Sequence, residues 1–385
     1  MIRLRWKEKW IDFESVEWSG TENQCSRQIT FTIPSNPYDK SFEKLAIKLG
    51  DLVYLYDGTK QLFVGTVTQR EKTAEIGTAS YTAMDFMHHL LRSNGTYKFT
   101  KTTPEKITKK VCSDVKVGTT KLATTKCNIA KMFFEDACIY DIIISAYRKA
   151  KALNGKKYMP VMVGNKVSVI EKGKSSGVKL VQGVSITDAS YSDTTDNMVD
   201  RVVIFNDKKK KLGQVEEKKN VSSYGVYQQV YTKEDGVDAK KQAKAMLVGI
   251  TKEASIESIG DINAISGYSI QIDDKATGLS GKFYIESDTH TFSDGVHTMS
   301  LELSYENSME EGTDYEGTSK KVVANNEKCY YLSSSTVYHS RTSCPACKGK
   351  NTKKTTVEKI KKIKITAGKN KGKRKYKACS KCWMS

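Results

Sequence analysis

Short runs of alternating apolar and polar residues dominate the first part of the chain. They are rich in β-branched and aromatic residues and are separated by Asn-Pro, Asp-Gly or polar clusters; they cover residues 2–6, 28–33, 51–58, 61–67 and 80–86. Such runs are typical of antiparallel strands. Asp85 is placed to cap a short amphipathic helix over residues 86–93. The pattern predicts a first β-barrel over residues 1–95.

Helical spacing replaces this alternation in the middle of the chain. Thr103 and Pro104 supply an N-cap and a first-turn proline for a helix over residues 104–115. A stronger helical pattern covers residues 136–152, and a β-hairpin pattern follows it. We therefore expect a small α/β insert over residues 96–177.

Strand patterns return from Val178 and are interrupted by one helical segment, residues 238–250. They predict a second β-barrel over residues 178–306. The acidic, polar segment 307–324 suits a flexible linker. The expected fold class is mainly β with an α/β insert (α+β): two tube-like β-barrel domains flank the small α/β domain, and a small zinc-type module over residues 325–385 ends the chain.

The positive charge is concentrated in that last segment. The formal net charge is +19, but residues 325–385 hold 17 lysines and arginines against two acids, whereas residues 1–324 hold 46 basic and 42 acidic residues. The large body is therefore nearly neutral, which argues against a general polyanion binder. No run reaches the roughly 18 apolar residues of a membrane span, and MIRLRWKEKW lacks the apolar core of a signal peptide. We expect synthesis in the bacterial cytoplasm and no membrane insertion.

The body carries no motif for catalysis. The HExxH, GxSxG, Walker and GxGxxG motifs are absent. His88 and His89 are adjacent on a predicted helix and point about 100° apart, so they cannot hold one metal ion together. His290 and His297 are expected to flank a hairpin turn and to face each other across two strands, without a third ligand. We therefore expect no enzyme activity and no catalytic residue.

Two CxxC pairs, separated by 31 residues, give the basic segment one specific motif. Each pair can hold a metal ion from a tight turn, and together they complete a tetrahedral shell, so we predict structural Zn²⁺. The predicted ligands are Cys344, Cys347, Cys379 and Cys382. His339 or Cys329 is a possible substitute for one of them, and iron or a disulfide remains an alternative. The lysine-rich stretch between the pairs is nearly free of aromatic residues, which disfavours nucleic acid as its partner.

Several motifs occur along the chain in an order that resembles that in baseplate hub proteins of contractile tails. The quoted motifs are Trp18-Ser19-Gly20, QITFTI at 28–33, GDLVYL at 50–55, FVGTV at 63–67 and YTAMDF at 81–86. The hubs of PBSX-like defective prophages and of phage-tail-like bacteriocins (tailocins) show the closest resemblance, which covers roughly residues 1–310. The final segment resembles the metal-binding domain of the alkylation-repair protein Ada, but differs from it in spacing and lysine content.

The resemblance implies a virion structural protein: a homotrimer whose six barrels form a ring between the six-fold tail tube and the three-fold central spike. Implied partners are the tail tube protein, the spike, the tape-measure terminus and other baseplate subunits. The implied location is the baseplate of a contractile tail particle, either a bacteriophage or a headless tailocin. Two other readings stay open: a nucleic-acid-binding protein that uses the basic zinc module, and a tail-associated cell-wall hydrolase.

Overall fold

The computed structural model describes residues 1–22, 26–36, 38–41, 44–71, 77–234, 237–309, 328–332, 337–339, 351–356, 359–360, 363 and 376–378. The chain divides into two compact units, Met1–Tyr315 and Glu316–Ser385, and each is described by itself. Within the described part, no helix combines the length and the apolar character that a membrane span needs.

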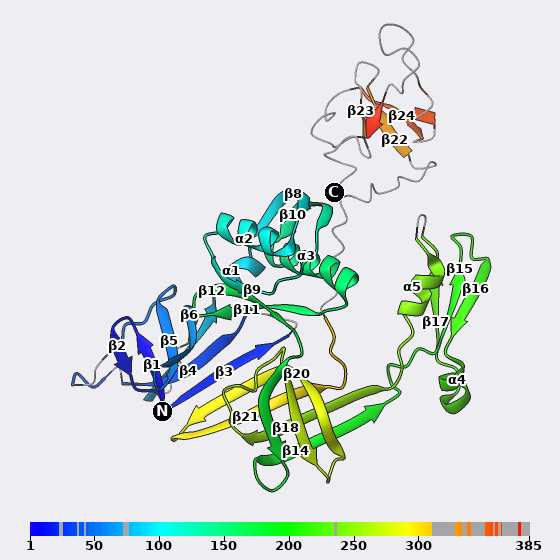
Figure 1. The fold of residues 1–385 in the computed structure, drawn as a ribbon. Helices are drawn as coiled ribbons and strands as arrows, with labels where there is room; N and C mark the ends of the chain where they lie inside the picture. Colours follow the sequence, from blue (N-terminus) through cyan, green and yellow to red (C-terminus); the bar gives the residue numbers. More distant parts are fainter. Residues whose placement is uncertain are drawn as a thin grey trace. The chain divides into compact units, whose positions relative to one another are not determined.

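A thirteen-stranded sheet is the main element of the first unit (Figure 1). Its N-terminal half contains β1 (Ile2–Trp6), β2 (Lys9–Ile11), β3 (Ser15–Thr21), β4 (Gln28–Ser35), β5 (Leu52–Asp57), β6 (Lys60–Glu71) and β7 (Gly77–Asp85). Its C-terminal half contains β13 (Ser175–Val181), β14 (Ile186–Thr194), β18 (Thr251–Ile259), β19 (Ser269–Asp274), β20 (Leu279–Ser293) and β21 (Val296–Ser304). β3 and β20 pair antiparallel and make the two halves one sheet.

Among the described residues, the strand pairing does not close either half of the sheet into the predicted β-barrel. The main path runs β14-β18-β21-β20-β3-β4-β7-β6-β5-β1-β2, and β19 and β13 branch from β20. Of the described residues, only Gln182 and Ile186 link two end strands of one half: their isolated bridge joins the end of β13 to the start of β14. Alternation predicts which face of a strand is buried, but it does not specify which edges meet. The mainly β character and the strand positions are as predicted.

Each half of the sheet buries its own apolar face. In the N-terminal half, Leu4, Val16, Phe31 and Leu55 belong to one core, as their alternation predicts. In the C-terminal half, inward-facing residues of β13, β18, β19, β20 and β21 form a second core. The sheet therefore has two apolar cores and one shared pair of strands.

The insert follows β7 and begins with α1 (Met87–Leu91). It also contains α2 (Pro104–Asp114), α3 (Ile139–Asn154), β8 (Asn94–Thr102), β9 (Gly118–Leu122), β10 (Ile129–Cys138), β11 (Tyr158–Val163) and β12 (Lys166–Glu171). The Thr103 hydroxyl accepts from the Lys106 amide, which confirms the predicted cap of α2. The prediction started α3 too early, because residues up to Cys138 pair with β8.

A separate small sheet interrupts the C-terminal half. β15 (Arg201–Phe205) lies between β16 (Lys211–Glu216) and β17 (Gln228–Thr232), and α4 (Lys218–Tyr224) and α5 (Ala239–Ala245) complete the module. The sequence predicted these strands as part of the second barrel. The structure instead gives them their own core, in which Val202, Ile204 and Ala243 are buried.

The second unit contains a four-stranded sheet. Its strands are β22 (Lys328–Tyr331), β23 (Val337–His339), β24 (Lys353–Thr356) and β25 (Lys377–Ala378). Cys329, Tyr338, Ile360 and Tyr376 are buried in a small apolar cluster. This core, as far as the second unit is described, is much smaller than the two cores of the thirteen-stranded sheet.

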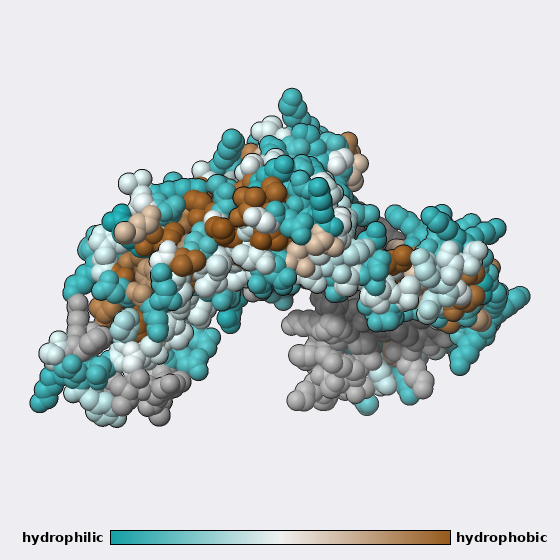
Figure 2. All heavy atoms as spheres, turned by 90° about the horizontal axis from the view of Figure 1, so that it is seen from below, coloured by the Kyte–Doolittle hydropathy of each residue, from teal (hydrophilic) through white to brown (hydrophobic). Residues whose placement is uncertain are grey.

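Some apolar side chains remain at the surface. Figure 2 shows apolar patches, in brown, among hydrophilic side chains on the face seen from below. Exposed large apolar residues of the first unit include Trp10, Val163, Val184, Ile259 and Val296. Contiguous apolar surface often marks sites of interaction with other proteins.

Candidate functional site

A buried ion pair lies where the two halves of the sheet meet. Arg27 precedes β4, and its Nη1 donates to Oδ1 of Asp288 on β20 at 2.9 Å, while Nη2 pairs with Oδ2. The Asp288 side chain is 0% exposed and that of Arg27 is 15% exposed. Burial by itself would raise the pKa of Asp288, but the Arg27 guanidinium and the hydrogen bonds from Arg27 and His290 hold it well below its ordinary value. Asp288 is therefore a buried carboxylate with a matched cation.

The local backbone is shaped around this pair. A Cβ atom at Gly20 would clash with Nη1 of Arg27, so a side chain at this position would displace the guanidinium. The Ser266 amide donates to Oδ1 of Asp288 at 2.6 Å. The guanidinium also lies 4.2 Å from the ring centroid of Trp18 on β3. Residues from three distant parts of the sequence thus hold one charge pair.

His290 and His297 face each other across β20 and β21, as predicted. Nδ1 of His290 lies 3.1 Å from Nε2 of His297, and Nε2 of His290 lies 3.1 Å from the carbonyl oxygen of Ala264. Because a carbonyl only accepts, Nε2 of His290 carries a proton and donates it to the Ala264 carbonyl. Burial, followed by the nearby His290, lowers the pKa of His297 to about 4. The described residues contain no cluster of three or more potential metal ligands.

Asp85 connects the sheet to the insert. It ends β7, and its carboxylate accepts from the Ser26 hydroxyl at 2.9 Å, from the Arg27 amide at 3.0 Å and from the Met87 amide at 3.0 Å. The predicted cap of α1 is wrong in position: Phe86 is the N-cap residue and has no side-chain cap, whereas Asp85 lies one residue earlier and accepts from the Met87 amide. Burial raises the pKa of Asp85 to about 7, although these hydrogen bonds act in the opposite direction.

A second buried ion pair holds the segment that leaves the sheet after β21. Lys172 and Glu22 are both almost fully buried and pair at 2.5 Å. Nζ of Lys172 donates to the Ser308 carbonyl at 2.7 Å, and the Ser308 hydroxyl donates to Glu22 at 2.9 Å. Asn307 donates to the Lys172 carbonyl at 3.0 Å. The end of β3, the end of the insert and residues 307–308 are fixed to one another.

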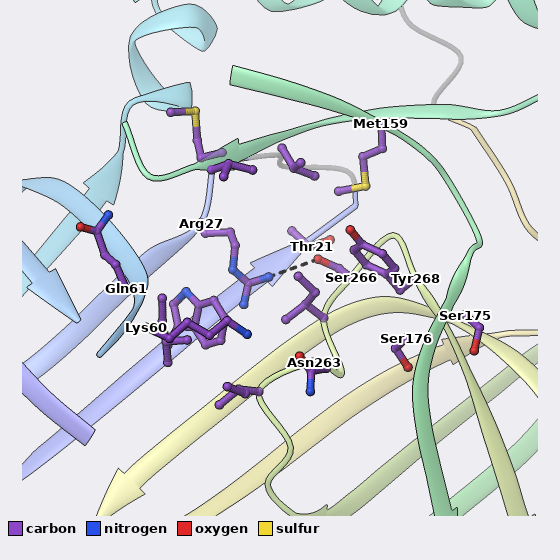
Figure 3. Close-up of a pocket in the computed structure, with 17 residues that line it drawn as sticks. Thr21, Arg27, Lys60, Gln61, Met159, Ser175, Ser176, Asn263, Ser266 and Tyr268 are labelled. Atoms are coloured by element: carbon purple, nitrogen blue, oxygen red, sulfur yellow. Dashed lines mark hydrogen bonds between the residues drawn. The ribbon is translucent and has the colours of Figure 1, made fainter. Parts of the chain in front are cut away.

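A cavity of about 340 Å³ lies beside the Arg27 site (Figure 3). Its walls come from the N-terminal half of the sheet, from β11, from the start of β13 and from residues 262–268. Arg27 and Lys60 supply cations, Met159 and Met162 supply flexible apolar surface, and a dashed line in Figure 3 joins Arg27 to Ser266. The lining thus combines apolar side chains with a few polar and cationic groups, a composition typical of binding pockets.

The four predicted zinc ligands lie outside the described residues. They are Cys344, Cys347, Cys379 and Cys382. The two possible substitutes are described: Cys329 and His339 are both buried in the second unit. Burial raises the pKa of the Cys329 thiol to about 11 and lowers that of His339.

Arg27 and Asp288 belong to no sequence motif that would predict a site. A signal for Asp288 was present, since alternation backwards from the buried Phe292 puts His290 and Asp288 on the same inward face of β20. A charged residue at an inward position needs a partner. The alternation pattern cannot identify that partner, because Arg27 lies 261 positions away in the sequence.

The fold is that of phage tail proteins. The structure is similar to the 43 kDa tail protein of prophage MuSo2 from Shewanella oneidensis, with a TM-score of 0.60 and 14% sequence identity. The similarity covers 79% of this chain and 98% of the tail protein.

The chain belongs to the YQBQ-like family, which it matches over residues 16–304. It is 28% identical to the uncharacterized protein YqbQ of Bacillus subtilis over an alignment of 317 residues that covers 79% of this chain and 96% of YqbQ. It is 27% identical, with the same coverage, to the phage-like element PBSX protein XkdQ of the same bacterium.

Proposed function

We propose that the chain is a structural hub of the baseplate of a contractile tail. It acts as a homotrimer that joins the six-fold tail tube to the three-fold central spike, in a phage or a tailocin. The observation that carries this proposal is the continuous sheet of two halves joined through β3 and β20. Three such chains supply six half-sheets, one for each subunit of a six-fold tube ring.

The buried contacts support a mechanical role. The Arg27–Asp288 pair ties the two halves together, and the Glu22–Lys172 pair ties the insert and residues 307–308 to the sheet. Neither pair lies in an arrangement of nucleophile and base. The proposed hub transmits force and seals the tube channel without breaking bonds, and its partners are the tube protein, the spike, the tape-measure terminus and neighbouring baseplate subunits. Its similarity to XkdQ of the phage-like element PBSX supports this placement.

We also propose one structural Zn²⁺ in the second unit, held by Cys344, Cys347, Cys379 and Cys382. The spacing of the two CxxC pairs supports it. Cys329 packs in a buried apolar cluster with Tyr338, Ile360 and Tyr376, which favours the four paired cysteines over this substitute.

Cryo-electron microscopy of tail particles from the source bacterium tests the hub proposal. We expect three copies of the chain at the junction of tube and spike, and deletion of its gene should leave no complete sheathed tails. Particles that lack the chain, or that carry it elsewhere, would contradict the proposal. So would cleavage of peptidoglycan by the purified chain, or salt-dependent binding of DNA as its main activity.

A further inference from the structure

The two ends of the thirteen-stranded sheet carry surfaces of opposite charge. The path of paired strands ends at β2 on one side and at β14 on the other. On β1, β2 and β5, the positions that alternate with the buried ones hold a basic-aromatic patch, which consists of Arg3, Arg5, Trp10, Tyr54 and Tyr56. On β14, β18 and β21 the equivalent outward positions hold an acidic patch, which consists of Asp188, Glu253, Glu257 and Glu302.

The basic-aromatic patch is organised before any partner binds. The Arg3 guanidinium lies 4.2 Å from the Trp10 ring centroid, and the Arg5 guanidinium lies 4.6 Å from that of Tyr54 and 5.6 Å from that of Tyr56. Trp10 is 48% exposed. Among the described residues Arg5 has no carboxylate partner, and its Nε is buried without a hydrogen bond. Exposed Trp, Tyr and Arg together are typical of the centres of protein interfaces.

Among the described residues, no cation forms an ion pair with a carboxylate of the acidic patch. Asp188 on β14 lies directly opposite Glu257 on β18, and Glu302 lies opposite Ser255 on the same face. The single lysine or arginine of β14, β18 and β21 is Lys252, whose Nζ lies 5.2 Å from the ring centroid of Tyr305. Directly opposite like charges destabilise an isolated sheet, so a cationic partner would relieve this repulsion. Ile259, 59% exposed, adds an apolar contact point beside Glu257.

We propose that the basic-aromatic patch of one copy docks on the acidic patch of a second copy of this chain. The inference rests on the proposed homotrimer and names the surfaces that form it. Because the two patches are different surfaces, the contact is heterologous and repeats in one direction around a ring. It also covers both terminal strands, β2 and β14, whose unpaired edges would otherwise invite uncontrolled association.

Charge reversal on the full-length chain, followed by native mass spectrometry, tests this interface. One variant carries Arg3→Glu and Arg5→Glu, and the other carries Asp188→Lys and Glu257→Lys. Each reversal places like charges opposite each other, so each variant should lose the trimer at concentrations where the unaltered chain is trimeric. A chain with all four changes restores opposite charges and should recover the trimer.

The second variant keeps the test valid if the first fails to fold, because Asp188 and Glu257 are exposed. The matched control is Lys208→Glu with Lys210→Glu, two exposed lysines in the turn between β15 and β16, which should leave the trimer intact. A trimer that survives both reversals would overturn this interface and leave the hub proposal standing. An unaltered chain that stays monomeric, also in tail particles, would remove the trimer and this interface together.

Discussion

At the scale of single residues, the Arg27–Asp288 pair should be the most sensitive contact in the sheet. Arg27→Ala leaves a fully buried carboxylate without its cation, and such a change costs about 3–5 kcal/mol in the free energy of unfolding. Denaturant unfolding of the full-length chain measures it. The control is Lys156→Ala, which removes an exposed ion pair with Glu171 and should cost at most about 1 kcal/mol. Equal losses in the two variants would show that the buried pair does not join the halves.

Asp85 should give the sheet a dependence on pH. Its folded pKa of about 7 lies above the ordinary value of 3.8, so the folded chain holds this proton more tightly than the unfolded chain. The stability that Asp85 contributes is therefore full below about pH 4 and is lost as the pH rises to about 7. At 1.36 kcal/mol for each pKa unit, the loss is at most about 4 kcal/mol.

Replacing Asp85 with asparagine removes this titration. The free energy of unfolding of the unaltered chain minus that of Asp85→Asn should therefore fall between pH 4 and pH 7, measured by chemical denaturation at several pH values. Asp114→Asn is the control. The hydrogen bond that Asp114 accepts from Lys110 lowers the pKa of this carboxyl below its ordinary value of 3.8, so its titration lies below the range from pH 4 to pH 7. A difference between unaltered chain and Asp85→Asn that stays constant with pH would refute the assignment.

At the scale of elements, the end of α3 depends on one backbone conformation. Gly155 has φ 72° and its amide donates to the Lys151 carbonyl, so it terminates the helix in the left-handed region. Gly155→Ala should lower the free energy of unfolding by about 1 kcal/mol, because a Cβ atom is strained there. Gly213→Ala on β16 is the control: a Cβ atom meets nothing within 4 Å, and its φ is not in that region. A Gly155 variant as stable as the control would contradict the proposed role.

The same scale shows what the sequence could predict. α2 and α3 were predictable because a cap, a proline and a terminal glycine are local signals. β10 was not predicted because a register shift between Phe134 and Ala137 breaks its alternation of buried and exposed residues. β9 was not predicted because none of its residues is fully buried, so it has no clear alternation. The order of the strands, and so whether a half closes, was not predictable because alternation does not identify the neighbouring strand. The Arg27–Asp288 contact was out of reach for the same reason, since it joins residues 261 positions apart.

At the scale of the whole molecule, the two units should differ in what stabilises them. Met1–Tyr315 has several large apolar cores, whereas the described core of Glu316–Ser385 is one small cluster in a lysine-rich sequence. Zinc bound by four thiolates contributes about 10–16 kcal/mol of apparent binding free energy in small modules. Metal, rather than apolar burial, should therefore determine whether the second unit folds.

Cys379→Ser tests this difference within the intact chain. We expect native mass spectrometry to find one zinc for each unaltered chain and none for the variant, and limited proteolysis to cut the variant within residues 316–385 while residues 1–315 survive. The control is Cys138→Ser, which changes a free cysteine of the first unit; this variant should retain the zinc of the second unit. A metal-free chain whose mass increases on reduction would indicate disulfides in place of the metal site. A variant that loses zinc but resists protease would show that the second unit folds without it, and the division of stability between the units would then be wrong.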